Sequence, residues 1–248
     1  METLYKYRDY SMWPLEMLTK REIYFSTPQQ LNDPYDCRIS IRQALSQAVQ
    51  QAIGGACAKL TERLEQLRKL DHVYERMEAD IGSVGVFSMS KRPDNVVMWA
   101  HYADNHAGFC AGFKLSPKFT THVNDYQVVG AADVLYSAGN PFADYFNEVA
   151  RQPSVPSWDE FWMSLLSVGM VAKAAAWTYE EEVRVLRKCG GPVPFEPSEL
   201  VEVVFGLNMP SDQQASLREL VAGDYWRHVR FRKVSRSDGF AVRIDDLE

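Results

Sequence analysis

The sequence lacks the segments that would anchor it in a membrane or mark it for export. No apolar run approaches the roughly 20 residues that a membrane-spanning helix requires. Residues 1–9 mix charged and aromatic side chains without an apolar stretch, so we expect no signal peptide. We therefore expect a cytoplasmic protein with no membrane partner. A net charge of -6 also gives it no general excess of basic residues for binding nucleic acid.

Cysteine and the common catalytic motifs are scarce or absent. The 4 cysteines are far apart and form no C-x-x-C pair, which disfavours a zinc site and predicts reduced thiols. No G-x-G-x-x-G loop, P-loop, H-E-x-x-H helix or G-x-S-x-G elbow occurs. His101 and His106 have no third ligand at a suitable spacing, so we expect no metal site.

What the chain does contain is enough apolar sequence for a large core, with 46% hydrophobic residues. Strand-like segments alternate irregularly with helix-like ones, and several strands are near neighbours in sequence. This order predicts an α+β fold with a mixed, mainly antiparallel sheet and packed helices. A proline-free stretch rich in helix formers predicts a helical insert near residues 41–81. We expect one domain over residues 1–248. The predicted strands are 4–8, 22–26, 84–90, 108–115, 128–136, 179–186, 200–205, 229–234 and 240–244, and the predicted helices outside the insert are 15–19, 95–103, 142–150, 158–176 and 210–222.

Two acidic residues stand out in the strand predicted at residues 179–186. In an extended strand Glu180 and Glu182 would share one face, about 6.5 Å apart. Like charges on one face suggest either a cation partner or a chemical task. The alternative is a solvated ladder in which Arg184 and an arginine of a neighbouring strand neutralise both carboxylates.

A second group of polar side chains lies on the predicted helix 95–103, which is apolar nearly all round and so predicted to be buried. His101 is a candidate acid–base group, and Trp99 and Tyr102 are its neighbours. The alternative is that His101 and Tyr102 are hydrogen-bonded polar groups in the core. The C-terminal hairpin is basic, and Arg230 and Arg232 share a face that binds phosphates or is simply solvated.

Four segments of the chain resemble the bacterial domain of unknown function 2971. They are L-Y-K-Y-R from Leu4, Y-F-S-x-P-x-x-L-N-D-P-Y-D from Tyr24, F-S-M-S-K-R-x-D-N-x-x-M-W-A-H-Y-A-D-N-H-x-G-F-C from Phe87, and W-x-Y-E-x-E-x-R from Trp177. The resemblance extends from about Leu4 to Phe205. The family name implies no particular activity.

A more distant resemblance implies one. An arginine on a first strand, a Ser-Thr step on a second and E-x-E on a later one are similar to the R-S-E pattern of ADP-ribosyltransferases. That resemblance implies a phosphate of NAD on Arg8, a nicotinamide-ribose pocket braced by Ser26, and Glu182 as the carboxylate that stabilises the oxocarbenium-like transition state. It implies that Glu180 faces the acceptor. Pro28 departs from this pattern, because a second serine is usual there.

Further residues complete the predicted nucleotide site. Tyr7 is a candidate for stacking on nicotinamide, together with Tyr35 or Trp177. Asp33 orients Arg8, or Asn32 merely starts a turn. The predicted catalytic residues are Glu182, Glu180 and His101, and the predicted cofactor-binding residues are Arg8, Ser26, Tyr7, Asn32, Asp33, Trp99 and Tyr102.

The favoured hypothesis is an NAD-dependent, ADP-ribosyltransferase-like enzyme, in the setting of a toxin or defence effector, with a protein or nucleic acid as acceptor. One alternative is a non-catalytic domain that senses a nucleotide or binds a protein. Another is a metal-dependent nucleic-acid-processing enzyme that uses Asp33, Glu180 and Glu182 with magnesium.

Overall fold

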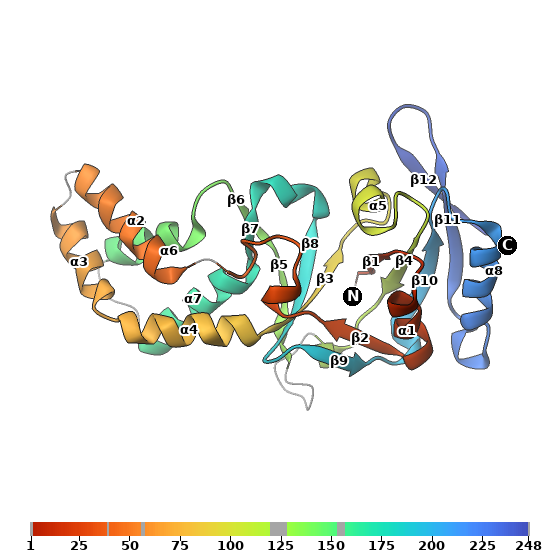
Figure 1. Ribbon diagram of the computed structural model, residues 1–248, viewed down its shortest axis with the longest axis horizontal. Coiled ribbons are helices and arrows are strands. Elements are labelled where there is room, and N and C mark those ends of the chain that lie inside the picture. Colours follow the sequence, from red (N-terminus) through yellow and green to blue (C-terminus); the bar gives the residue numbers. More distant parts are fainter. Residues whose placement is uncertain (1, 39, 56–57, 120–127, 153–156, 248) are drawn as a thin grey trace. The chain divides into compact units, whose positions relative to one another are not determined.

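A computed structural model describes residues 2–38, 40–55, 58–119, 128–152 and 157–247. The chain divides into two compact units, each built from more than one segment (Figure 1). The first, which we call the sheet unit, comprises Met1–Phe25, Val86–Asp133 and Thr178–Glu248. The second, the helical unit, comprises Ser26–Gly85 and Val134–Trp177. The single domain expected over residues 1–248 stays a prediction.

The sheet unit is organised around an eight-stranded sheet of order β12-β11-β10-β4-β1-β3-β8-β5. Its strands are β1 (Leu4–Arg8), β3 (Gly85–Ser90), β4 (Phe109–Phe113), β5 (Val128–Asp133), β8 (Glu182–Arg187), β10 (Leu200–Phe205), β11 (Arg230–Arg236) and β12 (Val242–Asp246). β10 and β11 are parallel, whereas β1 pairs antiparallel with both β3 and β4. This confirms the predicted α+β fold with a mixed, mainly antiparallel sheet.

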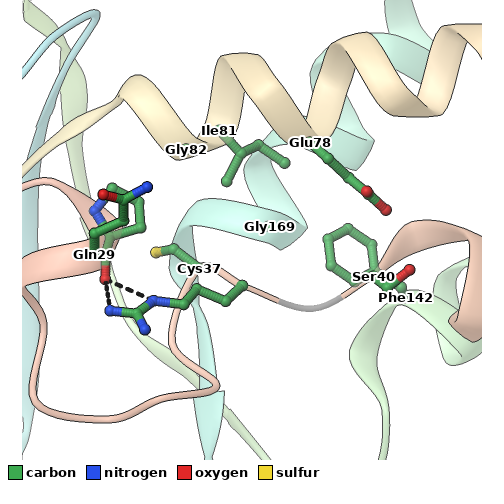
Figure 2. A pocket seen from close by; sticks show the side chains of 10 residues that line it. Gln29, Cys37, Ser40, Glu78, Ile81, Gly82, Phe142 and Gly169 are labelled. Carbon is green, nitrogen blue, oxygen red and sulfur yellow. Dashed lines mark hydrogen bonds between the residues drawn. The ribbon is translucent and has the colours of Figure 1, made fainter.

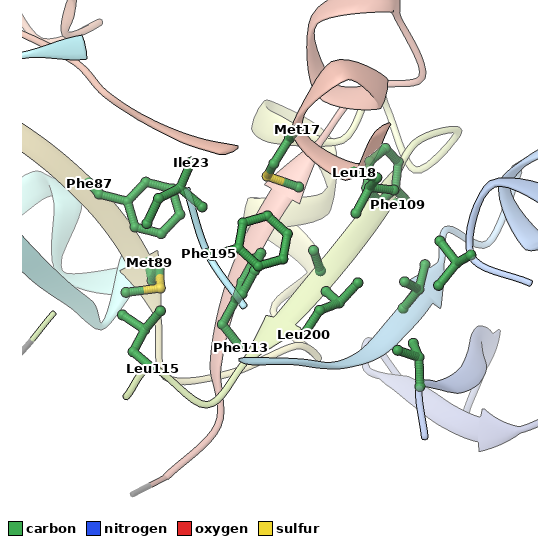
Figure 3. Close-up of a cluster of buried hydrophobic side chains, with 14 of the residues drawn as sticks. Met17, Leu18, Ile23, Phe87, Met89, Phe109, Phe113, Leu115, Phe195 and Leu200 are labelled. Carbon is green, nitrogen blue, oxygen red and sulfur yellow. The ribbon is translucent and has the colours of Figure 1, made fainter. Parts of the chain in front are cut away.

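Alternation along the strands gives the sheet two different faces. One face, here called the Phe113 face, carries the larger core, which includes Phe87, Phe113 and Val203. Helices α1 (Met12–Lys20) and α8 (Ser211–Leu220) contribute Met17, Leu18 and Leu217 to this core. Figure 3 shows Met17, Leu18, Phe87 and Phe113 gathered with Phe195 and Leu200 in this core.

The opposite face, here called the Trp99 face, carries a smaller core. Tyr7 of β1, Cys110 of β4 and Val204 of β10 pack there against Trp99. Trp99 belongs to the short helix α5 (Val96–Tyr102). Because Tyr7 and Cys110 are cross-strand partners, the register of β1 and β4 fixes which of their residues face α5.

A small second sheet corrects one expectation. Prolines at positions 192, 194 and 197 are typical of a loop, yet β9 (Gly191–Pro194) pairs antiparallel with β2 (Glu22–Phe25). Proline lacks a backbone donor, but it is tolerated in a strand with an unpaired edge. β9 pairs only with β2 in this two-stranded sheet. Its other edge therefore has no ladder hydrogen bonds that the missing N–H groups of Pro192 and Pro194 could break.

The helical unit contains the predicted insert near residues 41–81 as α2 (Ile41–Gly54), α3 (Ala58–Arg68) and α4 (Asp71–Ser83). These helices belong to one unit with α6 (Pro141–Arg151) and α7 (Trp158–Val171). The helix expected at 158–176 therefore ends early. Its last predicted residues form β7 (Ala172–Ala174), because they pair in parallel with β6 (Leu135–Ser137).

The described part of the chain contains no helix long and apolar enough to cross a membrane. The described cysteines are free thiols, with Cys37 and Cys110 buried and Cys189 exposed. Cys57 lies outside the described residues.

Candidate functional site

The sheet unit gathers several of the predicted site residues on its Trp99 face. We name this group the Glu180 cluster, and it consists of Tyr7, Trp99, His101, Tyr102, Tyr179 and Glu180. These residues come from β1, from α5 and from the segment just before β8. Residues far apart in the sequence thus supply the polar groups of one region.

Asn95 begins α5 and connects the helix to the segment before β8. Its side-chain Oδ1 accepts hydrogen bonds from the backbone N–H groups of Val97 at 3.0 Å and Met98 at 3.2 Å. Its Nδ2 donates to the backbone carbonyl of Tyr179. One amide thus caps the helix and holds the chain that carries Glu180. The expected burial of the whole helix was wrong, since Val96 and Val97 are 37% and 40% exposed while Trp99 is fully buried.

Trp99 and Tyr7 form the base of the cluster. Their rings meet edge to face, with centroids 5.1 Å apart. The Tyr7 hydroxyl donates to the carbonyl of Arg92, and the Trp99 indole donates to that of Pro93, each at 2.7 Å. Burial raises the pKa of Tyr7 well above its usual value, so this hydroxyl stays protonated.

The end of α5 is fixed by an unusual turn. Asp104, Asn105 and His106 all have positive φ angles, of 46°, 49° and 70°. Such angles cost free energy for residues other than glycine, so the surrounding contacts must enforce them. A Cβ on Gly206 would lie 2.2 Å from the His106 carbonyl oxygen, and only glycine allows that close approach. The turn thereby fixes α5 against β4 and β10.

The position of Glu180 differs from the prediction. It was expected in a strand with Glu182, but it ends the 3₁₀ helix η3 (Ala175–Glu180), and β8 begins at Glu182. Glu181, between them, has a φ of 43°, which interrupts the extended backbone. The simple same-face spacing therefore does not describe these two carboxylates.

Glu180 is nonetheless a buried carboxylate, with 4% of its surface exposed. The Tyr102 hydroxyl donates to its Oε1 at 2.6 Å, a short bond typical of a hydroxyl on a charged acceptor. Beside it, His101 Nδ1 lies 3.1 Å from the Tyr179 hydroxyl, and the two rings are 5.8 Å apart. His101 itself is exposed. The arrangement places an accessible imidazole at the edge of a buried acid–tyrosine pair.

Glu182 has a different environment. Arg184 donates from Nε to Glu182 Oε1 at 2.8 Å and from Nη2 to Oε2 at 3.2 Å. Both residues are buried, Arg184 completely. The ladder with Arg184 that was considered for this strand exists as a buried ion pair, not as a solvated one. As expected, Val183 and Val185 occupy the opposite side, since Val185 belongs to the core of the Phe113 face.

Arg8 lies away from this cluster. Its strand partner is Phe109, which packs in the core of the Phe113 face, whereas Tyr7 and Glu182 point to the Trp99 face. Arg8 and Glu182 are therefore on opposite sides of the sheet and do not share a pocket. Arg8 Nε is buried without a hydrogen bond to any described residue, and burial lowers the pKa of the guanidinium.

Ser26, Asn32 and Asp33 belong to the helical unit. Ser26 is half-buried, Asn32 is exposed and Asp33 is 4% exposed. Asp33 Oδ1 accepts from the backbone N–H of Tyr35 at 2.9 Å, so the Asx-type turn is made by Asp33, whereas the sequence suggested Asn32 as the start of a turn. A role for these residues in binding a cofactor stays a prediction.

The basic C-terminal hairpin forms ion pairs within the sheet unit. The hairpin itself is confirmed, and Gly239 has the φ of 85° that its turn requires. Arg230 and Arg232 approach the buried carboxylate of Glu202, at 3.1 Å and 3.5 Å. Tyr5 also donates to Glu202, at 2.7 Å. Glu202 supplies one negative charge for the two arginines, and phosphate binding by this hairpin stays a prediction.

Within the described residues, no group of three or more histidine, cysteine or acidic side chains is arranged to hold a metal ion. Cys110 is the packed thiol that was expected, because it is fully buried and its burial raises its pKa.

One family model matches part of the chain that carries this site. Residues 98–185 match the family model described as protein of unknown function (DUF2971), which covers about a third of the chain. The match begins within α5 and ends within β8, so it includes both halves of the contact between Tyr102 and Glu180. Neither the curated proteins nor the solved structures gave a match.

The sequence interpretation missed three residues that organise the cluster. From the sequence, Tyr179 is only part of a motif, Asn95 is only a possible helix cap, and Arg184 is only a charge in a solvated ladder. The signal for Tyr179 was present, because it directly precedes Glu180 in W-x-Y-E. The contact of Asn95 with the Tyr179 carbonyl could not be predicted, because it joins residues far apart in the sequence.

Proposed function

We propose that the Glu180 cluster is the active site of a nucleotide-using transferase, which transfers the ADP-ribosyl group of NAD in the manner of ADP-ribosyltransferases. The observation that supports it most directly is the buried Glu180 carboxylate, oriented by Tyr102 and flanked by the exposed His101. Breaking the bond between nicotinamide and ribose builds positive charge on the ribose. A preorganised carboxylate in a site of low dielectric stabilises that charge.

The environments of the two glutamates assign them different roles. Glu182 already faces the full positive charge of Arg184 through two hydrogen bonds, so little of its field is left for a substrate. Glu180 accepts from the neutral Tyr102 hydroxyl and directly follows Tyr179, which contacts the exposed His101. We therefore assign the electrostatic role to Glu180 and a structural role to Glu182, the reverse of what the E-x-E resemblance implies.

The remaining groups suit the other requirements of this reaction. The nicotinamide leaves as a neutral base with the electron pair of the broken bond, and the acceptor nucleophile must lose a proton. His101 is the accessible imidazole of the cluster and suits the role of base for that proton. Arg8 receives no role here, because it lies on the other face of the sheet. The acceptor and the toxin or defence setting stay predictions.

A non-catalytic nucleotide sensor is the second candidate. It is favoured by the mutual satisfaction of Tyr102 with Glu180 and of His101 with Tyr179. Paired groups of this kind form a rigid recognition surface, but they give up part of their hydrogen-bonding capacity before a substrate arrives.

The test is to incubate the purified protein with NAD and a cell lysate and to measure free nicotinamide. We expect Glu180→Gln to lower nicotinamide release about 100-fold or more, the usual loss when a preorganised electrostatic group is removed. Glu182→Gln is the matched control, because it makes the same change two residues away; at a temperature where it is folded, it should retain most of the activity.

The possible results separate the hypotheses. Thermal stabilisation by NAD without any nicotinamide release would favour the sensor. Equal activity of Glu180→Gln and the unaltered protein would refute the role of Glu180. Selective loss in a folded Glu182→Gln variant would restore the original R-S-E assignment of the carboxylate.

A further inference from the structure

A cavity of about 700 Å³ lies entirely within the helical unit. Residues of the N-D-P-Y-D motif, the start of α2, the β6–α6 connection and β7 line it. A volume of this size is within the range of small-molecule sites. No part of the transferase proposal uses this cavity.

The floor of the cavity contains buried charges. Asp36 and Lys173 have side chains that are 2% and 4% exposed, and Lys173 Nζ lies 3.8 Å from Asp36 Oδ2. Lys173 Nζ is also 5.1 Å from the centre of the Trp177 ring, a cation–π distance. These contacts hold an ammonium group and a carboxylate in fixed positions at the cavity.

Asp33 supplies the observation that points to a ligand. It is more than nine-tenths buried and lines the cavity. Its Oδ1 accepts from Tyr35 N–H, which fixes the carboxylate in one orientation at the cavity. A carboxylate held in this way is a preorganised acceptor for a hydroxyl group of a ligand.

The walls are polar but carry no excess of charge. The ionisable residues that line the cavity are two acids, Asp33 and Asp36, and two bases, Arg38 and Lys173. Gln43, Gln47 and Asn140 add amides that both donate and accept hydrogen bonds. Tyr35, with 75% of its surface exposed, adds an aromatic ring.

This mixture excludes some ligands and favours one chemical class. An anion would meet the Asp33 carboxylate, and a free amine would meet the Lys173 ammonium. A neutral molecule with several hydroxyl groups can donate to Asp33 and accept from Lys173 at the same time. We propose that this cavity binds a neutral polyhydroxylated ligand, either a sugar or the ribose of a nucleoside, through the Asp33 carboxylate.

A neighbouring cavity of about 250 Å³ differs in character, which helps to define the proposed site. It shares Arg38 and Ser40 with the larger cavity. Figure 2 shows Ile81 and Phe142 directed into it. The Arg38 guanidinium donates from Nε to the carbonyl of Pro28 at 2.9 Å. The apolar side chains Ile81 and Phe142 line the smaller cavity, so the groups that bind hydroxyls belong to the larger cavity.

The experiment is calorimetric titration of the full chain with D-glucose, D-ribose, adenosine, 2′,3′-dideoxyadenosine and inorganic phosphate. We expect saturable binding of at least one of the first three compounds and none of phosphate. Asp33→Asn should weaken that binding about tenfold or more, the usual loss for a hydrogen bond to a charged group. Asp80→Asn, the same change on the exposed part of α4, should leave it unchanged.

A second variant covers the case in which Asp33→Asn does not fold. Gln43 is exposed at the cavity wall, so Gln43→Ala should fold normally and weaken binding by a smaller factor. Binding of glucose or ribose indicates a sugar, and binding of adenosine that dideoxyadenosine lacks indicates a nucleoside. Three results would each overturn the proposal: no saturable binding of any compound, binding of adenosine and dideoxyadenosine with the same affinity, or unchanged binding by the Asp33→Asn variant. Nicotinamide release by the other unit is measured separately, so either proposal can fail alone.

Discussion

Asn95 is the residue whose replacement tests the architecture of the Glu180 cluster most directly. Its Oδ1 caps α5 through Val97 and Met98, and its Nδ2 binds the Tyr179 carbonyl. Loss of an N-cap costs about 1 kcal/mol, and loss of one buried hydrogen bond costs about 1 kcal/mol more. Asn95→Ala should therefore lower the free energy of unfolding by about 2 kcal/mol, or the melting temperature by roughly 4–8 °C for a chain of this size.

Asn95→Ser separates the two contributions. Serine is also a good N-cap, but its short side chain cannot donate to the Tyr179 carbonyl. We expect about half of the alanine effect. In α6, Asn140 caps the backbone N–H groups of Phe142 and Ala143 in the same way, so Asn140→Ser serves as a matched control with little change expected.

Hydrogen exchange gives the local readout of the same prediction. The amides of Val97 and Met98 should exchange faster in Asn95→Ala and at the normal rate in Asn95→Ser. If the serine and alanine variants are equally destabilised, the cap contributes nothing. If both lose less than about 0.5 kcal/mol, the contact with Tyr179 does not help to hold the cluster, and the reasoning fails.

Two further predictions concern buried groups of the sheet unit. Arg184→Met should lower the free energy of unfolding by about 3–5 kcal/mol, because it leaves the buried Glu182 carboxylate without its ion pair. Denaturant unfolding measures this loss, and the double variant Glu182→Gln/Arg184→Met should lose less than the sum of the losses in the two single variants. A loss below about 1 kcal/mol in Arg184→Met would contradict the pairing. Burial raises the pKa of Cys110, so near pH 8 the folded protein keeps this thiol protonated while an exposed thiol is partly ionised. Thiol titration with a disulfide reagent should therefore count one fewer fast-reacting thiol in Cys189→Ser than in the unaltered protein, and the same number in Cys110→Ser. A reduced count in Cys110→Ser would show that the core around Cys110 opens to the reagent.

Much of the fold could be predicted because the sheet strands have strong apolar patterns. β1 and β10 have the predicted bounds, and the hairpin of β11 and β12 forms around the predicted Asp238–Gly239 turn. The errors occurred where backbone conformation overrides residue preference. The prolines of β9 indicate a loop, not a strand, and no pattern in the sequence predicts the positive φ angle of Glu181.

The candidate site could be anticipated only in pieces. The motifs grouped Glu180 with Arg8 and Ser26 and set Trp99, His101 and Tyr102 apart as a second group, whereas the structure brings Trp99 and Tyr102 together with Glu180. Arg8 was assigned to the same pocket as its neighbour Tyr7, although adjacent residues of a strand point to opposite faces. That error could have been avoided from the sequence. The capture of Glu182 by Arg184 could not, because its burial depends on tertiary packing.

The family match also bears on which part of the chain is needed for either site. Residues 98–185 contain β4 but neither of its strand neighbours, β1 and β10. They contain Tyr102, Glu180 and Lys173, but Tyr7 and Asp33 lie before them. An isolated strand of buried residues with two unpaired edges is not stable in water. The matched segment is therefore a portion of a larger folding unit, and both proposed sites require chain outside it.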